Sequence, residues 1–290
     1  MSRRHAVMLV VLAAIWGASF MFIKVAVREL EPVTLVWIRI VLAAAVLVPV
    51  ALVVVGRDAV AETRAAAGRL TVLAIVNSVV PFTLLAWAET RIDSAFAAML
   101  QAAAPLFTAL ILLRFGDDRV GGSRLVGVLV GFVGVALLVG APGGGDVLAA
   151  LAVVATALCY ASAGVFAGHR LRDTHPLVVG AGSMAIAAVL TAPFGLVTLP
   201  GRLPGWKETG SVLLLGIVGT GVAYMLFFAI LRGAGASRSI LVTYLVPSAA
   251  LLYGVLLLGE ELRPVAVAGL ALILGGVALG ARRGGVASPA

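Results

Sequence analysis

Residues 105–138 read PLFTALILLRFGDDRVGGSRLVGVLVGFVGVALL, and residues 247–280 read PSAALLYGVLLLGEELRPVAVAGLALILGGVALG. The two stretches align without a gap at an offset of 142 residues, and they overlap a longer match of Leu84–Leu137 to Leu226–Leu279 at the same offset. The chain therefore contains an internal repeat. The identical pairs at this offset include Pro105 with Pro247, Gly127 with Gly269, and Gly134 with Gly276.

The composition assigns the chain to a lipid bilayer. Of its 290 residues, 62% are hydrophobic and 12% are charged, and the mean hydropathy is +1.16. So few polar side chains do not cover a water-soluble globule of this size. The net charge is +8, but the basic residues lie singly between apolar runs and form no stripe. We therefore expect a lipid environment and no nucleic-acid partner.

Apolar runs long enough to cross a bilayer recur along the whole chain, since about 20 residues of α-helix span the hydrocarbon core. We predict ten spans, five in each half, so the second half is inverted relative to the first. The runs lie near residues 7–27, 33–55, 69–88, 94–113, 122–140, 147–168, 177–199, 211–231, 237–258 and 264–281. The predicted fold class is an all-α integral membrane protein of ten transmembrane helices in two inverted five-helix repeats. Such a pair of repeats is typical of carriers that open alternately to the two sides.

The basic residues predict the orientation, because cytoplasmic loops carry an excess of Lys and Arg. With the N-terminus inside, the cytoplasmic tails and loops hold 14 of the 21 basic residues and the opposite loops hold five. Both termini are therefore expected in the cytoplasm. The 14 are Arg3, Arg4, Arg57, Arg64, Arg69, Arg114, Arg119, Arg124, Arg170, Arg172, Arg232, Arg238, Arg282 and Arg283, and the five are Arg28, Arg91, Arg202, Lys207 and Arg263.

The side chains that catalysis or metal binding requires are not grouped in this sequence. The single cysteine, Cys159, lies within an apolar run, which excludes a disulfide and a zinc site. The adjacent acids Asp117-Asp118 and Glu260-Glu261 fall on opposite sides of the predicted membrane. No phosphate-binding loop or metal-ligand spacing is present. We expect no enzymatic activity, no catalytic residues, no metal and no cofactor.

The same stretches resemble the EamA-type repeat of the drug/metabolite transporter superfamily. In the first half, Pro105-Leu106-Phe107-Thr108 is followed by Gly116-Asp117 and then by Gly127. In the second half, Pro247-Ser248 is followed by Leu258-Gly259-Glu260-Glu261-Leu262 and by Gly269, Gly275 and Gly276. Trp16-Gly17-Ala18-Ser19-Phe20 in the first span and Arg39 in the second stand at family-like positions. The first repeat departs from the second by having Gly116-Asp117-Asp118 in place of Gly259-Glu260-Glu261.

The resemblance implies a ten-helix transporter whose repeats, at residues 1–140 and 146–282, enclose a central cavity. Family members move amino acids, metabolites and drugs, and we expect a secondary carrier that exports small amphipathic metabolites from a bacterial cytoplasmic (inner) membrane. Exchange of drugs, sugar phosphates or nucleotide sugars is the first alternative, although only Lys24 and Arg39 are placed to pair with phosphate. A membrane-embedded structural or assembly role is the second. The oligomeric state stays open.

Prolines and glycines locate the predicted helix breaks. Pro81 follows Asn77 by four residues, and Pro105 follows Gln101 by four, so each amide lies one turn before a carbonyl that proline leaves free. Breaks at matching places in two repeats indicate a substrate site at mid-membrane. The hinge candidates are Gly17, Pro81, Pro105 and Pro247. The ordinary alternative is that these residues serve only close helix packing.

Polar and aromatic side chains at the predicted mid-membrane depth are the candidates for substrate binding. Trp16 lies about ten residues into its span, too deep for an interfacial anchor. The tyrosine hydroxyls need hydrogen-bond partners in lipid. The full set is Trp16, Ser19, Arg39, Asn77, Gln101, Tyr160, Tyr224 and Tyr244.

A charged side chain within an apolar run either reaches the membrane surface or takes part in a buried site. Arg39 and Lys24 lie near the outer ends of their runs, and snorkelling to the surface is favoured over substrate binding. Glu89 and Asp93 flank a turn and are expected to be solvated. This leaves no buried carboxylate, so a facilitator or an exchanger fits at least as well as a proton antiporter. A proton or a counter-substrate remains open as the coupling partner.

Overall fold

The computed structural model describes residues 3–115, 122–140, 146–235 and 241–281. Every regular element in these ranges is a helix. In the first half the helices are α1 (Arg3–Ala26), α2 (Pro32–Val55), α3 (Asp58–Ala65), α4 (Ala67–Ala74), the π-helix η1 (Ile75–Val79), α5 (Val80–Glu89), α6 (Ser94–Gln101), α7 (Ala104–Phe115) and α8 (Gly122–Val139). In the second half they are α9 (Val147–Arg170), α10 (Pro176–Val197), α11 (Trp206–Leu213), the π-helix η2 (Leu214–Val222), α12 (Ala223–Ala234), α14 (Val242–Leu258) and α15 (Pro264–Ala281).

Within the described residues, seven helical segments are long and apolar enough to cross a membrane. They are Arg3–Ala26, Pro32–Val55, Ala67–Glu89, Ser94–Arg114, Val147–Arg170, Pro176–Val197 and Trp206–Ala234. Three shorter apolar helices, Leu125–Val139, Val242–Leu258 and Pro264–Leu279, lie in the remaining predicted runs. Many large apolar side chains on these helices face outward, among them Val53, Val197 and Leu256. An apolar exterior suits lipid rather than water, which confirms an all-α membrane protein.

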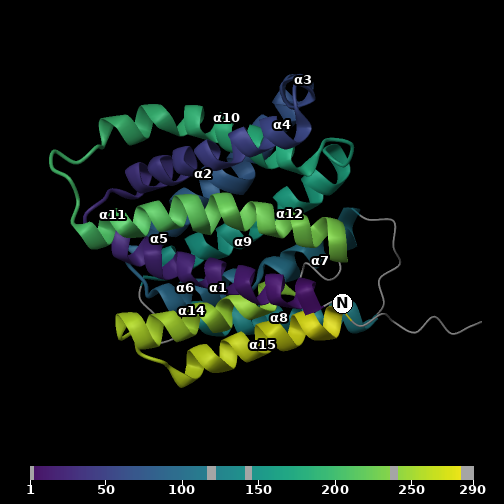
Figure 1. The fold of residues 1–290 in the computed structure, drawn as a ribbon. Coiled ribbons are helices and arrows are strands. Elements are labelled where there is room, and N and C mark those ends of the chain that lie inside the picture. Colours follow the sequence, from purple (N-terminus) through teal and green to yellow (C-terminus); the bar gives the residue numbers. More distant parts are fainter. Residues whose placement is uncertain (1–2, 116–121, 141–145, 236–240, 282–290) are drawn as a thin grey trace, which may run out of the picture.

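The two outermost layers of the bundle each pair a helix from one half with a helix from the other. Figure 1 shows α15 beside α8 at the bottom of the molecule, and α10 beside α2 at the top. Helices α1, α5, α6, α9 and α12 lie between these layers. The largest cluster of buried apolar side chains extends through residues of both halves. The halves therefore share one core.

Glycines allow α8 and α15 to approach at backbone distance. A methyl group on Gly134 would lie 2.6 Å from the carbonyl oxygen of Gly269, and one on Gly276 would meet the Gly127 carbonyl oxygen. The contact is reciprocal. Gly134 meets Gly269, and the residues that the 142-residue offset assigns to them, Gly276 and Gly127, meet each other. Small residues are what close helix packing in lipid requires, since lipid supplies no hydrophobic drive for association. The stretch that revealed the repeat is thus one contact surface.

The helix connections gather at two ends of the bundle. At the first, which we call the acidic end, Glu29 Oε2 accepts a hydrogen bond from Gly205 N at 2.8 Å, and Thr34 Oγ1 lies 2.7 Å from Thr198 Oγ1. At the other, the basic end, Arg69 Nη1 donates to the Arg170 carbonyl oxygen at 3.0 Å. The N-terminus, α3 and the α9–α10 connection lie at the basic end (Figure 1).

Two π-helices lie in corresponding spans of the two halves. The 142-residue offset carries η1 onto residues 217–221, which fall inside η2. A π-helix adds a residue per turn and shifts the side chains that follow it, and such segments occur frequently at functional sites. Pro81 predicts an interruption in the first of these two spans. The structure has a change of helix type there, with no gap in the helix.

Candidate substrate site

Arg39 of α2 lies inside the protein between the two halves. The residue is only 7% exposed, and its Nε donates a hydrogen bond of 2.9 Å to Thr220 Oγ1 of η2. The guanidinium carbon lies 3.7 Å from the centre of the Phe82 ring, which is a cation–π contact. Among the described residues no carboxylate lies within 4.0 Å of it. The snorkelling interpretation of Arg39 is therefore wrong, because the side chain turns inward toward η2.

Two tyrosines and an amide from three further elements lie in the neighbourhood of this guanidinium. Tyr160 of α9 and Tyr224 of α12 are both close enough to act on Arg39 electrostatically. Asn77 of η1 donates a hydrogen bond of 2.8 Å from its Nδ2 to the Tyr224 hydroxyl. Four of the eight predicted substrate residues thus meet in one place. The phenol, amide and guanidinium groups together can bind a carboxylate or another small polar group.

The glycines of η2 let α1 and α2 pack directly against it. A methyl group on Gly219 would lie 2.9 Å from Ser19 Oγ, and one on Gly216 would lie 2.6 Å from Leu42 Cβ. Ser19 is buried and donates to the Ile15 carbonyl oxygen at 3.1 Å. The predicted residue Ser19 therefore lies against η2, one helix away from Arg39, with its hydroxyl bonded to its own helix.

A row of aromatic rings joins Trp16 to the Arg39 cluster. The ring centroids of Trp16 and Phe227 are 5.6 Å apart, those of Phe227 and Phe228 are 5.9 Å apart, and those of Phe228 and Tyr224 are 5.9 Å apart. All three contacts have tilted geometry, the arrangement that aromatic quadrupoles favour over face-to-face stacking. Trp16 belongs to a second apolar cluster near the basic end, with Leu9 and Ile230. It is connected to the cluster around Arg39 without being part of it.

Gln101 and Tyr244 lie outside the Arg39 cluster. Gln101 Oε1 accepts a 2.7 Å hydrogen bond from Thr156 Oγ1 of α9, at the point where α6 ends. Tyr244 of α14 is partly buried against the main core. The structure therefore divides the predicted set into Arg39, Asn77, Tyr160 and Tyr224, which come together, and Trp16, Ser19, Gln101 and Tyr244, which flank them.

The four hinge candidates have different surroundings. Pro81 stands in the first turn of α5, directly after η1, and Pro105 follows a helix boundary between Gln101 and Ala104. Pro247 shows no break, because α14 is continuous from Val242 to Leu258 around it. Gly17 packs on α14, where an added methyl group would lie 2.6 Å from Ala249 Cβ. Its surroundings are those of a close helix contact.

Glu89 is buried, contrary to the expectation that it is solvated. Its exposure is 0%, and neither carboxyl oxygen has a hydrogen-bond partner among the described residues. The statement that the chain lacks a buried carboxylate is therefore wrong. The error has a physical reason: Glu89 is the last residue of α5, and position at a helix end does not say which way the side chain turns. The sequence signal for the burial of Glu89 is Phe82, a large apolar residue seven positions earlier on the same face of α5.

Two side chains clamp the turn that follows Glu89. Lys24 Nζ of α1 donates to the carbonyl oxygens of Glu89 at 2.8 Å and Ile92 at 2.7 Å, so Lys24 caps the end of α5 and does not snorkel. Glu260 of the second half accepts hydrogen bonds from Ser94 N at 2.8 Å, Ser94 Oγ at 2.7 Å and Ala95 N at 2.9 Å. A carboxylate at the start of α6 also complements the helix dipole. Its counterparts Asp117 and Asp118 lie outside the described residues.

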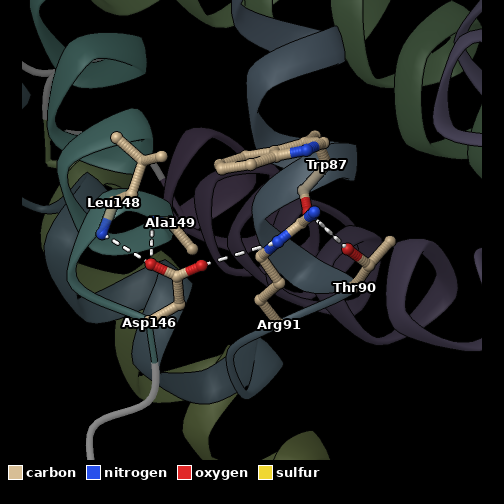
Figure 2. A network of polar contacts seen from close by, with 6 residues as sticks. All are labelled: Trp87, Thr90, Arg91, Asp146, Leu148 and Ala149. Carbon is tan, nitrogen blue, oxygen red and sulfur yellow. Dashed lines mark hydrogen bonds and ion pairs between the residues drawn. The ribbon is translucent and has the colours of Figure 1, made fainter.

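An exposed network covers α5 and α9 at the acidic end. Figure 2 shows the Arg91 guanidinium beside the Trp87 indole, with its carbon 4.0 Å from the ring centre. Arg91 Nε lies 3.5 Å from Asp146 Oδ2, and Asp146 caps α9 by accepting from Leu148 N at 2.7 Å. Next to this network is an open cleft of about 630 Å³. The cleft is lined by Glu31, Pro32, Val33, Thr83, Leu84, Trp87, Leu148, Leu151 and Ala152, none of which is a predicted substrate residue.

Similar proteins place this geometry in a family. Residues 4–140 and 147–281 match the model of the EamA-like transporter family. The chain is 25% identical over 280 residues to an uncharacterized transporter of Archaeoglobus fulgidus, across 96% of this chain and 98% of that one. It is 29% identical over 208 residues to a probable terminal-alkyne amino-acid exporter of Streptantibioticus cattleyicolor, across 69% and 68%.

A solved crystal structure shares the fold, with a TM-score of 0.68 at 23% sequence identity over 97% of both chains. The family match covers nearly all of the sequence that the ten apolar runs occupy. Together with the apolar exterior of the helices, it confirms the resemblance drawn from the repeat. The chain belongs to the EamA-like transporter family.

Proposed function

We propose that this transporter is a secondary carrier that exports small amphipathic carboxylates, amino acids foremost, by alternating access. The observation that carries the proposal is Arg39, a buried guanidinium with no carboxylate partner among the described residues. A buried charge is costly unless it is paired, and a substrate carboxylate would supply the pair. Asn77, Tyr160 and Tyr224 stand around it to donate further hydrogen bonds.

The proposed architecture is ten transmembrane helices in two inverted repeats, residues 1–140 and 146–282. The reciprocal contact of Gly127 with Gly276 and of Gly134 with Gly269 supports it, because a two-fold axis generates such exchanged pairs. The two π-helices in corresponding spans support it as well. In the proposed cycle the halves rock about this axis, and the Arg39 cluster at their boundary opens first to one side and then to the other.

The proposed orientation puts the basic end in the cytoplasm of a bacterial cell, with both termini inside. The excess of arginine in the loops of that end supports it. Export would then begin at the basic end and finish at the acidic end. The relative named as a terminal-alkyne amino-acid exporter supports both the direction and the substrate class.

Exchange of sugar phosphates or nucleotide sugars is the weaker alternative. Phosphate carries two charges and is usually met by more than one cationic side chain. Lys24, the other basic residue that the sequence offered as a partner for phosphate, is bonded to the carbonyl oxygens of Glu89 and Ile92. Arg39 alone matches a single carboxylate better than a phosphate group.

The test uses purified protein in liposomes loaded with the twenty L-amino acids, sugar phosphates and nucleotide sugars, with mass spectrometry of the external solution. We expect selective release of amino acids, strongly reduced by Arg39→Gln. Arg91→Gln is the matched control, because Arg91 also stacks on an aromatic ring but at the surface. Release of phosphorylated compounds alone, or equal release by wild type and Arg39→Gln, would contradict the proposed substrate site.

A further inference from the structure

We propose that Glu89 is the proton-carrying residue of this transporter, and that a proton and the ammonium group of the substrate compete for its carboxylate. The result is antiport of one proton against one exported substrate. The inference rests on the proposed function, since it specifies how that same site is driven. The inference adds a second charged group to the substrate site. Arg39 binds the carboxylate end of the substrate, and Glu89 binds its ammonium end.

The first observation is the isolation of the Glu89 carboxyl group. It is 0% exposed, and both oxygens lack hydrogen-bond partners in the described part of the chain. Burying an ionised carboxylate without hydrogen bonds costs far more than burying a neutral acid. The empty carrier in this conformation therefore holds Glu89 as the neutral carboxylic acid. Intramembrane acids of this kind mark proton relays.

The second observation is the set of charges that act on Glu89 from the surrounding helices. They are Lys24 of α1, Arg39 of α2 and Glu260 of the loop before α15. Lys24 Nζ is bonded to main-chain carbonyl oxygens and not to the carboxyl group, and Glu260 is bonded to the start of α6. Helix α6 has no charged side chain, and the titratable residues of α9 before His169 are Cys159 and Tyr160. Among the described residues, the Glu89 carboxyl group therefore forms no ion pair.

The third observation is the position of Glu89 relative to Arg39. Phe82, whose ring forms the cation–π contact with the Arg39 guanidinium, precedes Glu89 by seven residues on α5. Seven residues of α-helix fall about 20° short of two full turns and rise about 10 Å, so both side chains share one face. Helical side chains lean toward the N-terminus, which directs the Glu89 carboxyl group toward Phe82. Glu89 and the ring partner of Arg39 thus lie on one face of α5, about two turns apart.

The proton cycle follows from these positions. With the carrier open at the basic end, a zwitterionic substrate enters, its carboxylate pairs with Arg39, and its ammonium group pairs with Glu89. The O–H bond of Glu89 breaks, and the proton goes to water on the cytoplasmic side. After the halves rock, the substrate leaves at the acidic end, and Glu89 takes a proton from water there. The empty carrier returns with the acid neutral.

Lys24 and Glu260 control access to Glu89 from the acidic end. Lys24 of the first half binds the carbonyl oxygens at both ends of the turn after Glu89, and Glu260 of the second half binds the first residues of α6, which directly follow that turn. With these hydrogen bonds made, the acidic end is closed over the carboxyl group. Rocking of the halves separates Lys24 on α1 from Glu260 on the second repeat, and the segment then uncovers Glu89.

The first test reads the protonation state directly and needs no substrate. Infrared spectra of the full-length protein in lipid at pH 7 should show the C=O stretch of a protonated carboxylic acid. Glu89→Gln should remove that band, and Asp146→Asn, which alters an exposed carboxylate, should keep it. A spectrum in which Glu89→Gln removes only the band of an ionised carboxylate would overturn the proposal, whether or not the protein carries amino acids.

The second test measures coupling in liposomes that hold the twenty L-amino acids, with a pH-sensitive dye inside and the membrane potential clamped to zero. A one-to-one antiporter under a gradient of about one pH unit sustains about a tenfold substrate gradient. We expect wild type and Asp146→Asn to build up this substrate gradient when the pH gradient is applied. Glu89→Gln should lose it and lose substrate-dependent acidification. The exchange of labelled for unlabelled amino acid that remains in this variant, weakened by the loss of the ammonium partner, should no longer depend on pH.

The outcomes separate the two proposals. If wild type exchanges amino acids but a pH gradient drives no accumulation, the proton role is wrong and the proposed carrier function stands. If accumulation persists in Glu89→Gln, another group carries the proton. If Glu89→Gln fails to fold, Glu89→Asp replaces it, and an unchanged pH dependence in that variant contradicts the proposal. If wild type moves no amino acid, the proposed function fails, and with it the coupling scheme, whatever the infrared band shows.

Discussion

Two arginines of the first repeat make the same aromatic contact in opposite surroundings. Arg39 lies 3.7 Å from the centre of the Phe82 ring and is 7% exposed, whereas Arg91 lies 4.0 Å from the centre of the Trp87 ring with 39% of its side chain exposed. Arg91 has a carboxylate neighbour in Asp146, as Figure 2 shows, and water reaches it. Arg39 has no carboxylate neighbour among the described residues, and its burial shields it from water.

The difference shows that a charge has meaning for function only together with its solvation. An exposed guanidinium is already satisfied by water, so its ion pair contributes little. A buried guanidinium needs a counter-charge, and a carrier can let its substrate provide it. The four predictions below alter one arginine or the other, or the groups that hold Arg39 in place.

The largest effect is expected at Arg39. Arg39→Gln removes the charge, and loss of a charge-assisted hydrogen bond of about 1.5–3 kcal/mol corresponds to about 10- to 150-fold in transport rate. Arg39→Lys keeps the charge but loses the planar fork, so we expect a smaller loss. Initial rates in liposomes measure both. Equal stability with wild-type rates in both variants would show that the buried charge is structural.

The next effect is expected at Thr220, the residue that fixes Arg39. Thr220→Val leaves the buried Nε–H without its acceptor, at a cost of about 1–3 kcal/mol. The midpoint of thermal unfolding in detergent should fall. The matched control is Thr83→Val, because Thr83 Oγ1 donates only to the Val79 carbonyl oxygen of its own helix. A similar shift in both variants would contradict a specific role for the Arg39 contact.

A smaller effect is expected at the pair of Asn77 and Tyr224, which borders the guanidinium. Tyr224→Phe removes one side-chain hydrogen bond within the membrane, which averages about 0.6 kcal/mol, or about threefold in apparent substrate affinity. A double-mutant cycle with Asn77→Ala should give a coupling energy of that size. Strict additivity would mean that the two groups act independently.

The smallest effect is expected at Arg91. Arg91→Gln and Asp146→Asn each break an ion pair of 3.5 Å between partly exposed side chains. Such pairs contribute about 0–1 kcal/mol and weaken with salt, so transport should stay within about twofold of wild type. Rates at low and high ionic strength provide the measurement. A loss as large as that of Arg39→Gln would remove the distinction between the two arginines.

The recurrent apolar runs and the aligned glycines were enough to predict a helical membrane transporter of this family. The α8–α15 contact uses the four glycines that the sequence alignment paired as Gly127 with Gly269 and Gly134 with Gly276. This works because the length and composition of a span depend on the bilayer, which is the same for every helix. Packing of small residues is likewise a local property of the sequence.

The tertiary structure alone decided which charged side chains point inward. Arg39 and Glu89 both lie toward the ends of apolar runs, where sequence depth favours the surface, yet both are buried. The reason is that these helices are apolar on all faces, so no hydrophobic stripe tells how a helix is rotated about its axis. Neighbouring helices set that rotation. The sequence thus determined that the chain spans a membrane, and the packing of α5 and η2 against α2 decided where its buried charges meet.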